Sequence, residues 1–192
     1  MDLGWGNQKA SKFATNVGLI TSHGPNGQNI MAAEWTFYLS YSPAIISVHT
    51  GGDKNGKATA ENVIATKEFG VNIASSEQNV ASSIAGGSSG RDVDKIAILK
   101  EMGFDFFKGK KIGALMLKGA ATNAECRLIE AKQVGDHLML IGEVVEIESD
   151  ASKQPLIYSF GKYYHLGEQM HKPEQGVLDK IAALKIKYAK KK

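Results

Sequence analysis

Short apolar and β-branched runs separated by turn residues dominate the first part of the chain, which is the pattern of strands. Val17–Ser22 is such a run, and Pro25-Asn26-Gly27 follows it as a strong turn signal. We therefore expect Gln28–Leu39 to return as the partner strand of a hairpin. After a break at Ser42-Pro43, the β-branched run Ala44–Thr50 predicts a further strand.

The middle of the chain changes to a helical pattern. Thr59–Thr66 has a Thr start, an early Glu and apolar residues on one side, and Phe69–Ala74 then returns as a strand. Further helices are expected over Glu77–Ala85 and Asp92–Met102, separated by a Gly/Ser loop at residues 86–90.

The second half returns to strands. The candidates are Ala114–Leu117, Ala120–Val134, His137–Ser149 and Leu156–Leu166, and Val177–Tyr188 reads as a terminal helix. Both faces of the His137–Ser149 strand are largely apolar, so we expect it to lie between a barrel interior and a second covered surface, such as a dimer contact.

Together these elements predict a mainly β fold with peripheral helices. Many short strands favour a closed barrel, because closure removes exposed sheet edges. The sequence shows no internal repeat and no domain linker, so residues 1–192 are expected to form one domain, with a C-terminal helix and Lys-rich tail over about 177–192.

Composition indicates an ordinary soluble globule, with 43% hydrophobic and 22% charged residues. No apolar run approaches the ~18 residues of a membrane span, and the N-terminus lacks a signal-peptide pattern, so we expect a cytoplasmic protein without membrane contact. The single cysteine, Cys126, cannot form an internal disulfide and is expected to be a buried small apolar residue rather than a redox thiol.

The formal net charge of +3 is partly local to the C-terminus. Lys185, Lys187 and residues 190–192 gather there, which is typical of a solvated helix end. A nucleic-acid or membrane patch is the alternative. Because Tyr188 is the one aromatic residue among these lysines, too few for a strand-binding groove, we expect no nucleic-acid partner.

Several chemistries lack their sequence signatures. No G-x-G-x-x-G opens a helix after a strand, and the Gly-rich stretch at residues 86–90 lacks the Lys-Ser/Thr ending of a phosphate loop. The five histidines show no close pairing on a helix, so no metal site is expected. No nucleophile elbow is present, and no catalytic acid or base stands out.

Four stretches, in order, resemble the flavin reductase-like, FMN-binding split-barrel family, which includes the flavoredoxins. They cover most of the chain, and their joint order is more specific than any one of them. The stretches are Val17–Ser22 with Asn29–Trp35 and Ser42-Pro43-Ala44; Lys57–Val63 with Glu68–Asn72; Ser89–Lys95; and Gly142–Val145 with Pro155–Tyr158 and Tyr163–Gly167. One departure is Ile96, where the family usually has Phe after the Asp-Lys pair, a conservative packing change.

The resemblance implies a Greek-key split β-barrel that forms a homodimer with FMN near the interface; FAD is the alternative flavin. It implies an oxidoreductase in which NADH or NADPH gives a hydride to the flavin, which then reduces a small-molecule or protein acceptor. Three hypotheses stay open: an NAD(P)H-dependent flavin or ferric reductase, an electron carrier that holds FMN permanently, and a ligand-binding barrel without a redox role.

The resemblance also implies that the segment from Asn29 to Thr36 lies beside the flavin. Its members are Asn29, Met31, Ala32, Ala33, Glu34, Trp35 and Thr36. Small alanines would let a flat ring approach the backbone, and strand alternation would put Asn29, Met31, Ala33 and Trp35 on one face. The alternative is a plain hairpin strand with Trp35 in the core.

Cationic and hydroxyl side chains just before a helix suit a phosphate. Lys57 and Thr59 fit this pattern, because helix N–H groups and the helix dipole favour an anion there. The alternative is a helix capped by Thr59 beside a solvated Lys57. His49 and Thr50, which end the preceding strand, are expected to line the flavin site, although a structural histidine is an equal alternative.

The loop before the third helix supplies the remaining candidates. In the resembling flavoproteins this motif lies near the flavin, which implies that Ser89, Gly90, Arg91 and Lys95 belong to the flavin site. The cations Arg91 and Lys95 would hold phosphate or stabilise a reduced, anionic flavin. The alternative is charge on a helix surface.

Overall fold

The computed structural model describes residues 1–4, 6–53 and 56–190. The strands are, in chain order, β1 Thr15–Asn16, β2 Gly18–Ser22, β3 Asn29–Ala33, β4 Thr36–Tyr41, β5 Ala44–Gly51, β6 Glu68–Ile73, β7 Phe106–Lys108, β8 Leu115–Leu117, β9 Thr122–Val134, β10 His137–Ser149, β11 Ile157–Ser159 and β12 Lys162–Tyr164. The helices are a 3-10 turn at Gln8–Ala10, α1 Ala58–Thr66, α2 Asn79–Gly87, α3 Lys95–Glu101 and α4 Gln175–Lys187. Residues 54 and 55 of the expected loop before α1, and residues 191 and 192 of the Lys-rich tail, lie outside the described residues.

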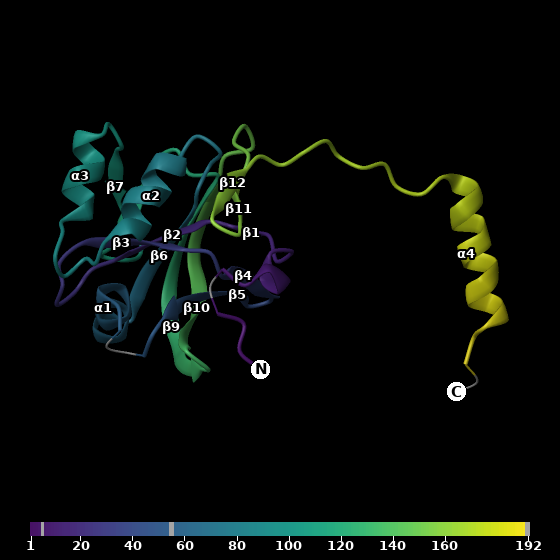
Figure 1. Cartoon of the computed structure of the whole chain (residues 1–192), viewed down its shortest axis with the longest axis horizontal. Helices are drawn as coiled ribbons and strands as arrows, with labels where there is room; N and C mark the ends of the chain where they lie inside the picture. Colours follow the sequence, from purple (N-terminus) through teal and green to yellow (C-terminus); the bar gives the residue numbers. More distant parts are fainter. Residues whose placement is uncertain (5, 54–55, 191–192) are drawn as a thin grey trace.

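Seven antiparallel strands form the main sheet, in the order β3-β2-β6-β9-β10-β5-β4. The sheet curls so that β3 also contacts β5, and side chains from both halves share one core. In that core Met31 and Ala33 of β3 join Ile46 and Val48 of β5 around the fully buried Phe69. The fold is mainly β with peripheral helices, as the sequence predicts (Figure 1).

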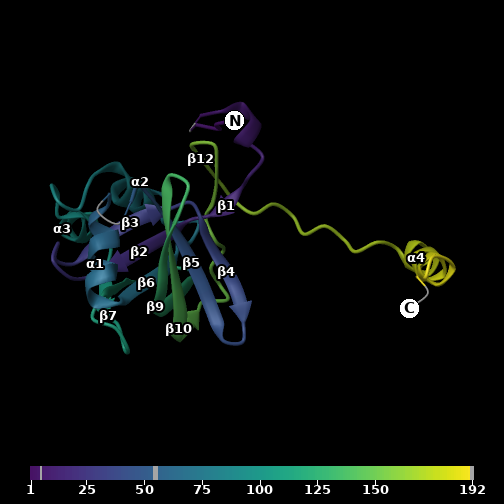
Figure 2. The same ribbon diagram turned by 90° about the horizontal axis from the view of Figure 1, so that it is seen from below.

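Helices α1, α2 and α3 lie on the side of β2 and β3, away from β4 and β5 (Figure 2). Strand alternation explains this second layer. Ile20 of β2 faces the barrel core, whereas Leu19 and Ile30 face a second core with Ala81 of α2 and Leu99 of α3. Strands β2 and β3 are therefore apolar on both faces.

The prediction of one strand over Gln28–Leu39 is wrong. The chain bends at Glu34 and Trp35, so β3 pairs with β2 and β4 pairs with β5, at opposite edges of the main sheet. The alternation therefore does not extend to Trp35. Its side chain is 39% exposed, which also rules out the alternative of a core tryptophan.

Other elements also differ from the sequence prediction. The strand expected over Leu156–Leu166 is two short strands, β11 and β12, which pair with each other across a turn at Phe160-Gly161. Helix α3 begins at Lys95 rather than at Asp92, because the Asp94 side chain accepts the N–H of Ala97 at 3.0 Å and caps the helix. Strand β7 was not predicted; it pairs with β8 as a separate ribbon.

One face of β10 lies on the barrel interior, as expected, whereas the second covered surface stays a prediction. Leu138 and Leu140 are buried in the barrel, whereas Met139 and Ile141 on the other face are only partly buried. Helix α4 stands apart from the body at the end of an extended segment (Figure 1). None of the described helices is both long enough and apolar enough to cross a bilayer.

Candidate functional site

Side chains from three distant segments meet at the N-terminus of α1. The Asn29 amide of β3 donates to the Thr59 hydroxyl at 2.8 Å, and both side chains are buried. The loop after α2 closes on the same point, because a Cβ built on Gly90 would lie only 2.2 Å from Asn29 Oδ1. Only glycine allows this approach without displacing Asn29.

The N-terminus of α1 carries no side-chain cap. Lys57 is the N-cap residue and makes no capping hydrogen bond with its side chain. Thr59 is not the cap that one sequence alternative proposed; it lies in the first turn and accepts the Asn29 amide. An uncapped first turn directs N–H groups and the positive end of the helix dipole at whatever lies before it, which favours an anion.

A buried ammonium group lies beside this helix start. Lys95 is 3% exposed, and its Nζ donates to the carbonyl oxygens of Ala85 at 3.0 Å and Ser88 at 3.1 Å. Burial, and secondarily the positive charge of Lys57, lower the pKa of Lys95 to about 8. None of the ion pairs between described side chains involves Lys95. The structure therefore contains a cation that a bound anion would stabilise.

Arg91 points along the outside of α1. Its guanidinium pairs with Glu61 at 2.7 Å, and its backbone N–H is bonded to the Ser89 hydroxyl at 3.2 Å. A hydrogen bond from Asn26, followed by that from Arg91, lowers the pKa of Glu61. These contacts tie the loop after α2 to the first turn of α1 and fix the position of Gly90.

The β3 candidates face two different layers. The Met31 and Ala33 side chains are buried in the barrel core, whereas Ala32 lies 3.4 Å from a Cβ built on Gly86 of α2. A ligand beside β3 would therefore meet mainly its backbone. Because β3 is an edge of the main sheet, its outer N–H and C=O groups are on the open side.

Glu34 and Thr36 lie at the bend that follows β3. The Thr36 hydroxyl donates to the carbonyl of Ala33 at 3.2 Å, and its side chain fills the space that a Cβ on Gly18 would need. Burial raises the pKa of Glu34. Thr36 therefore stabilises the bend, and the bend exposes Trp35 next to it.

An aromatic and imidazole cluster continues from the bend. The rings of Trp35 and His137 lie 4.5 Å apart between centroids, and those of Trp35 and His49 lie 6.2 Å apart. Burial, followed by the proximity of His137, lowers the pKa of His49. The adjacent Thr50 hydroxyl is buried without a hydrogen-bond partner in the structure. The His49 ring stands edge-on to Trp35, at 83°, and the His137 ring is tilted from it by 34°, so Trp35 supplies the aromatic surface and the two imidazoles lie beside it.

Sequence reasoning missed His137 as a member of this cluster. Its strand pairs with β5 in a register that sets His137 opposite Gly51 and Met139 opposite His49. The tight turn at Gly135-Asp136 only sets His137 opposite Val134 of β9, and its place beside Gly51 comes from the long-range pairing of β10 with β5, which no local pattern contains.

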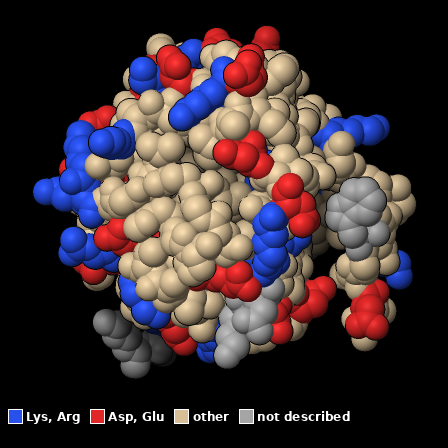
Figure 3. Space-filling view, turned by 90° about the vertical axis from the view of Figure 1, so that its left-hand side faces the viewer, with Lys and Arg blue, Asp and Glu red and all other residues tan. Residues whose placement is uncertain are grey.

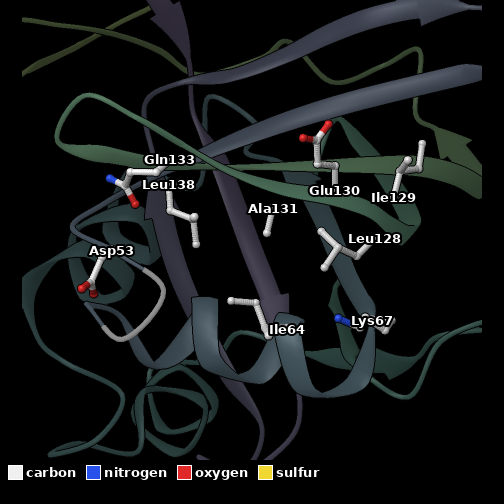
Figure 4. Close-up of a pocket in the computed structure, with 9 residues that line it drawn as sticks. All are labelled: Asp53, Ile64, Lys67, Leu128, Ile129, Glu130, Ala131, Gln133 and Leu138. Atoms are coloured by element: carbon white, nitrogen blue, oxygen red, sulfur yellow. The ribbon is translucent and has the colours of Figure 1, made fainter.

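Two hollows lie beside the helices, one at α3 and one at α1. One, of about 440 Å³, is bordered by Gly90 and Arg91 together with Asn26, Gln28 and Lys100. The other, of about 610 Å³, lies between α1 and the β9–β10 hairpin, where Ile64 points from the helix toward Leu128, Ala131 and Leu138 (Figure 4).

Charge on the face near α1 and α3 is uneven. Lys and Arg side chains gather along one edge of this face, and its middle carries few charges (Figure 3). Among residues 1–4, 6–53 and 56–190, no group of three or more His, Cys, Asp or Glu side chains is arranged to hold a metal ion.

Comparison with known proteins finds relatives of this chain among flavin-dependent reductases and flavoredoxins. The chain is 26% identical over 156 residues to an NADH-dependent FMN reductase, RutF, of Stutzerimonas stutzeri, covering 81% of this chain and 83% of the relative. Its structure is similar to that of the NADH:FAD oxidoreductase SgcE6 of Streptomyces globisporus, with a TM-score of 0.74, 21% identity and coverage of 84% and 93%. It is also similar to flavoredoxin from Methanosarcina acetivorans, with a TM-score of 0.75, 21% identity and coverage of 88% and 94%.

The two structural likenesses show the shared split-barrel fold. The model of the flavin reductase-like domain matches residues 10–167, which include every candidate site residue. The assignment of residues outside this match to the same domain stays a prediction. This match shows that the chain belongs to the flavin reductase-like domain family, in agreement with the fold and the oxidoreductase class that the sequence predicts.

Proposed function

We propose that this chain holds FMN, with the flavin phosphate at the N-terminus of α1, and passes electrons from NADH or NADPH to an acceptor. One observation carries the proposal. Lys95 is buried beside an uncapped helix start, and no ion pair between described side chains gives it a carboxylate partner. A phosphate dianion supplies the negative charge that this arrangement favours.

The surrounding residues fit the other parts of FMN. From the helix start, the open edge of β3 leads to the bend at Glu34 and Trp35. Backbone groups of an edge strand can hydrogen-bond to the ring edge, and the aromatic surface of Trp35 can contact a flat ring.

The bound flavin would supply the redox chemistry, and the protein would bind and orient it. Lys57, Lys95 and the first turn of α1 would fix the phosphate, while Asn29 and Thr59 would hold the β3 edge against the helix. In this proposal Arg91 is a positioning residue, because its guanidinium pairs with Glu61.

FAD is the alternative flavin. The hollow of about 440 Å³ begins at Gly90 and Arg91, next to the proposed phosphate position, and could admit the extra nucleotide. The relatives include both an FMN reductase and an NADH:FAD oxidoreductase. The likeness to a flavoredoxin supports the alternative function of an electron carrier, which would retain FMN and exchange electrons with a protein partner.

We also propose a homodimer with the flavin near the interface. The outer face of β10 presents partly buried Met139 and Ile141, and Phe37 of β4 is 40% exposed on the same side of the sheet. A second copy would cover this apolar face. Sedimentation with and without flavin tests the proposal, and a monomer that still binds FMN tightly would contradict it.

An anaerobic titration tests the electron-transfer function. The bound flavin is first identified by extraction, and NADH or NADPH is then added to the yellow protein. Bleaching without a partner protein indicates a reductase, whereas bleaching only with a protein donor indicates the carrier. Colourless protein that cannot be loaded with any flavin would contradict the function as a whole.

The phosphate position has its own test. Lys57→Ala combined with Thr59→Ala should weaken FMN binding, because it removes a nearby cation and the partner of Asn29. Unchanged FMN affinity in this double variant, measured by fluorescence titration, would show that the phosphate binds elsewhere.

A further inference from the structure

Glu34 is a carboxylate without a cation, at the bend where the edge strand β3 ends. Its side chain is partly buried, and burial raises its pKa. None of the ion pairs between described side chains involves Glu34. A partly buried charge without a partner is unfavourable in the protein alone, so this bend is suited to a positively charged group of a ligand.

Two aromatic residues lie next to this carboxylate. Trp35 follows it in the chain and is 39% exposed. Tyr158 of β11 lies close enough that the charge of Glu34, after burial, raises the pKa of its phenol. The Tyr158 ring lies 5.5 Å from that of Tyr163 between centroids, and the Tyr163 hydroxyl donates to Ser82 of α2 at 3.0 Å, which fixes this pair of rings. A carboxylate beside aromatic rings is a typical environment for an organic cation.

The neighbouring imidazoles are not the missing partner of Glu34. Burial, followed by the proximity of His137, lowers the pKa of His49 below the ordinary 6.5, so the His49 ring is neutral near pH 7. The Nδ1 atom of His137 lies 2.7 Å from the Asp136 carboxylate and is paired there. The cation that suits Glu34 must therefore come from a ligand.

Glu34 lies at the opposite end of β3 from the proposed phosphate position. Asn29 begins the strand and contacts Thr59 of α1, and Glu34 is five positions further on, or about 16–17 Å at about 3.3 Å per residue. An extended FMN has a similar length, so a flavin with its phosphate at α1 would bring its ring to the bend. A hydride donor must stack on that ring within about 3–3.5 Å, which puts its own ring beside Trp35 and Glu34.

We propose that Glu34, with Trp35 and Tyr158, forms the subsite of the nicotinamide ring and stabilises the positive charge that hydride transfer leaves on this ring. The proposal rests on the proposed function. In this step the C4–H bond of the reduced nicotinamide breaks, and the hydrogen leaves with both electrons to bond to N5 of the oxidised flavin. The neutral dihydropyridine becomes a pyridinium cation, and the flavin takes up the negative charge. A carboxylate that gains its partner only as this cation forms stabilises the transition state more than the reactant.

Equilibrium binding tests the subsite without any reaction. The FMN-loaded full-length protein is titrated by calorimetry with the oxidised form of the nucleotide that reduces the wild type, and with its tetrahydro derivative, whose ring is neutral and donates no hydride. Glu34→Gln should bind the oxidised nucleotide about fivefold more weakly and the tetrahydro derivative equally well, because only the first ring is charged. Glu34→Asp should keep most of the preference. Glu101→Gln, an exposed carboxylate at the end of α3, is the matched control and should behave as the wild type.

Anaerobic stopped-flow mixing gives a second readout. Bleaching of the flavin by NADH or NADPH should be about fivefold slower in Glu34→Gln than in the wild type, and Glu34→Asp should recover most of the rate. The sign of this effect is diagnostic. If the carboxylate acted on the flavin instead, it would disfavour the reduced, anionic ring, and its removal would make bleaching faster.

Three results for Glu34→Gln would overturn the proposal. They are the same change, or no change, in affinity for the charged and the neutral nucleotide; faster bleaching; and loss of FMN loading, which would place Glu34 against the flavin itself. The wild type separates these results from failure of the proposed function. Wild-type protein that holds no flavin, or whose flavin neither nucleotide reduces, contradicts the reductase function. Normal reduction of the wild type with an indistinguishable Glu34→Gln variant contradicts only the role of Glu34.

Discussion

Replacing Lys95 with methionine separates the cost of a buried ammonium from its role in binding. Lys95 is 3% exposed, and its pKa of about 8 lies well below the ordinary 10.5 because of burial first and Lys57 second. At about 1.4 kcal/mol for each pKa unit, this difference opposes the charged form by about 3 kcal/mol in the protein without a ligand. Methionine keeps much of the side-chain volume and removes the charge.

The sign of the stability effect follows from proton binding. Between about pH 8 and pH 10.5 the unfolded chain holds the Lys95 proton and the folded chain does not. The free energy of unfolding of the wild type should therefore rise through this window by up to about 3 kcal/mol relative to Lys95→Met. Loss of the bonds to Ala85 and Ser88 costs the variant about 1–3 kcal/mol at every pH, so the slope with pH is the signal.

The charge of Lys95 should have opposite effects on stability and on binding. It destabilises the folded protein without a ligand, but it should strengthen the binding of FMN. A bound phosphate favours the charged lysine, so Lys95→Met should weaken FMN binding at pH 7 by about 10- to 100-fold. Above about pH 8 the wild type must take up a proton to bind, and its affinity should fall by up to about tenfold per pH unit. Fluorescence titration from pH 7 to 9.5 measures both effects, with exposed Lys108→Met, which borders neither hollow, as control. Equal FMN affinity of wild type and Lys95→Met would refute the reasoning.

Two other substitutions test neighbouring parts of the site. Gly90→Ala should weaken FMN binding by about tenfold, because the new Cβ would lie 2.2 Å from Asn29 Oδ1 and displace that side chain, whereas Gly87→Ala, with nothing within 4 Å, should bind FMN normally in the same titration. His137→Gln should raise the pKa of His49, because the neighbouring imidazole lowers it; an unchanged NMR titration of His49 would show that the two rings do not interact.

Most strands were predictable from sequence because short apolar and β-branched runs bounded by turn residues are local signals. The exception is the bend at Glu34 and Trp35, where the two halves of one apolar run pair with different partners at opposite sheet edges. Pairing of this kind depends on contacts distant in sequence, which no local pattern contains. The resemblance supplied the order of the motifs but not this division.

The site was predictable as a set of segments and not as a set of contacts. That Asn29, Thr59 and Gly90 meet depends on how β3, α1 and the loop after α2 pack. Lys95 is the first residue of α3, directly after the capping Asp94, and a lysine in this position is normally expected to be exposed. Its burial arises because the end of α2 supplies two carbonyl acceptors, from Ala85 and Ser88.

The structure tests only some of the expectations that were drawn from composition. A cytoplasmic location, a single domain over residues 1–192 and the lack of a nucleic-acid partner stay predictions. The expectation for Cys126 is confirmed, because it is fully buried in the barrel core and burial raises the pKa of its thiol to about 12.

The affinity of the protein for FMN compared with riboflavin tests the central claim most directly. The two ligands share the ring and differ by the phosphate, which we place at the start of α1 beside Lys57 and Lys95. Charge-assisted bonds of about 1.5–3 kcal/mol each predict that FMN binds at least about 100-fold more tightly in paired calorimetric titrations at pH 7. Equal affinity for FMN and riboflavin would contradict the account.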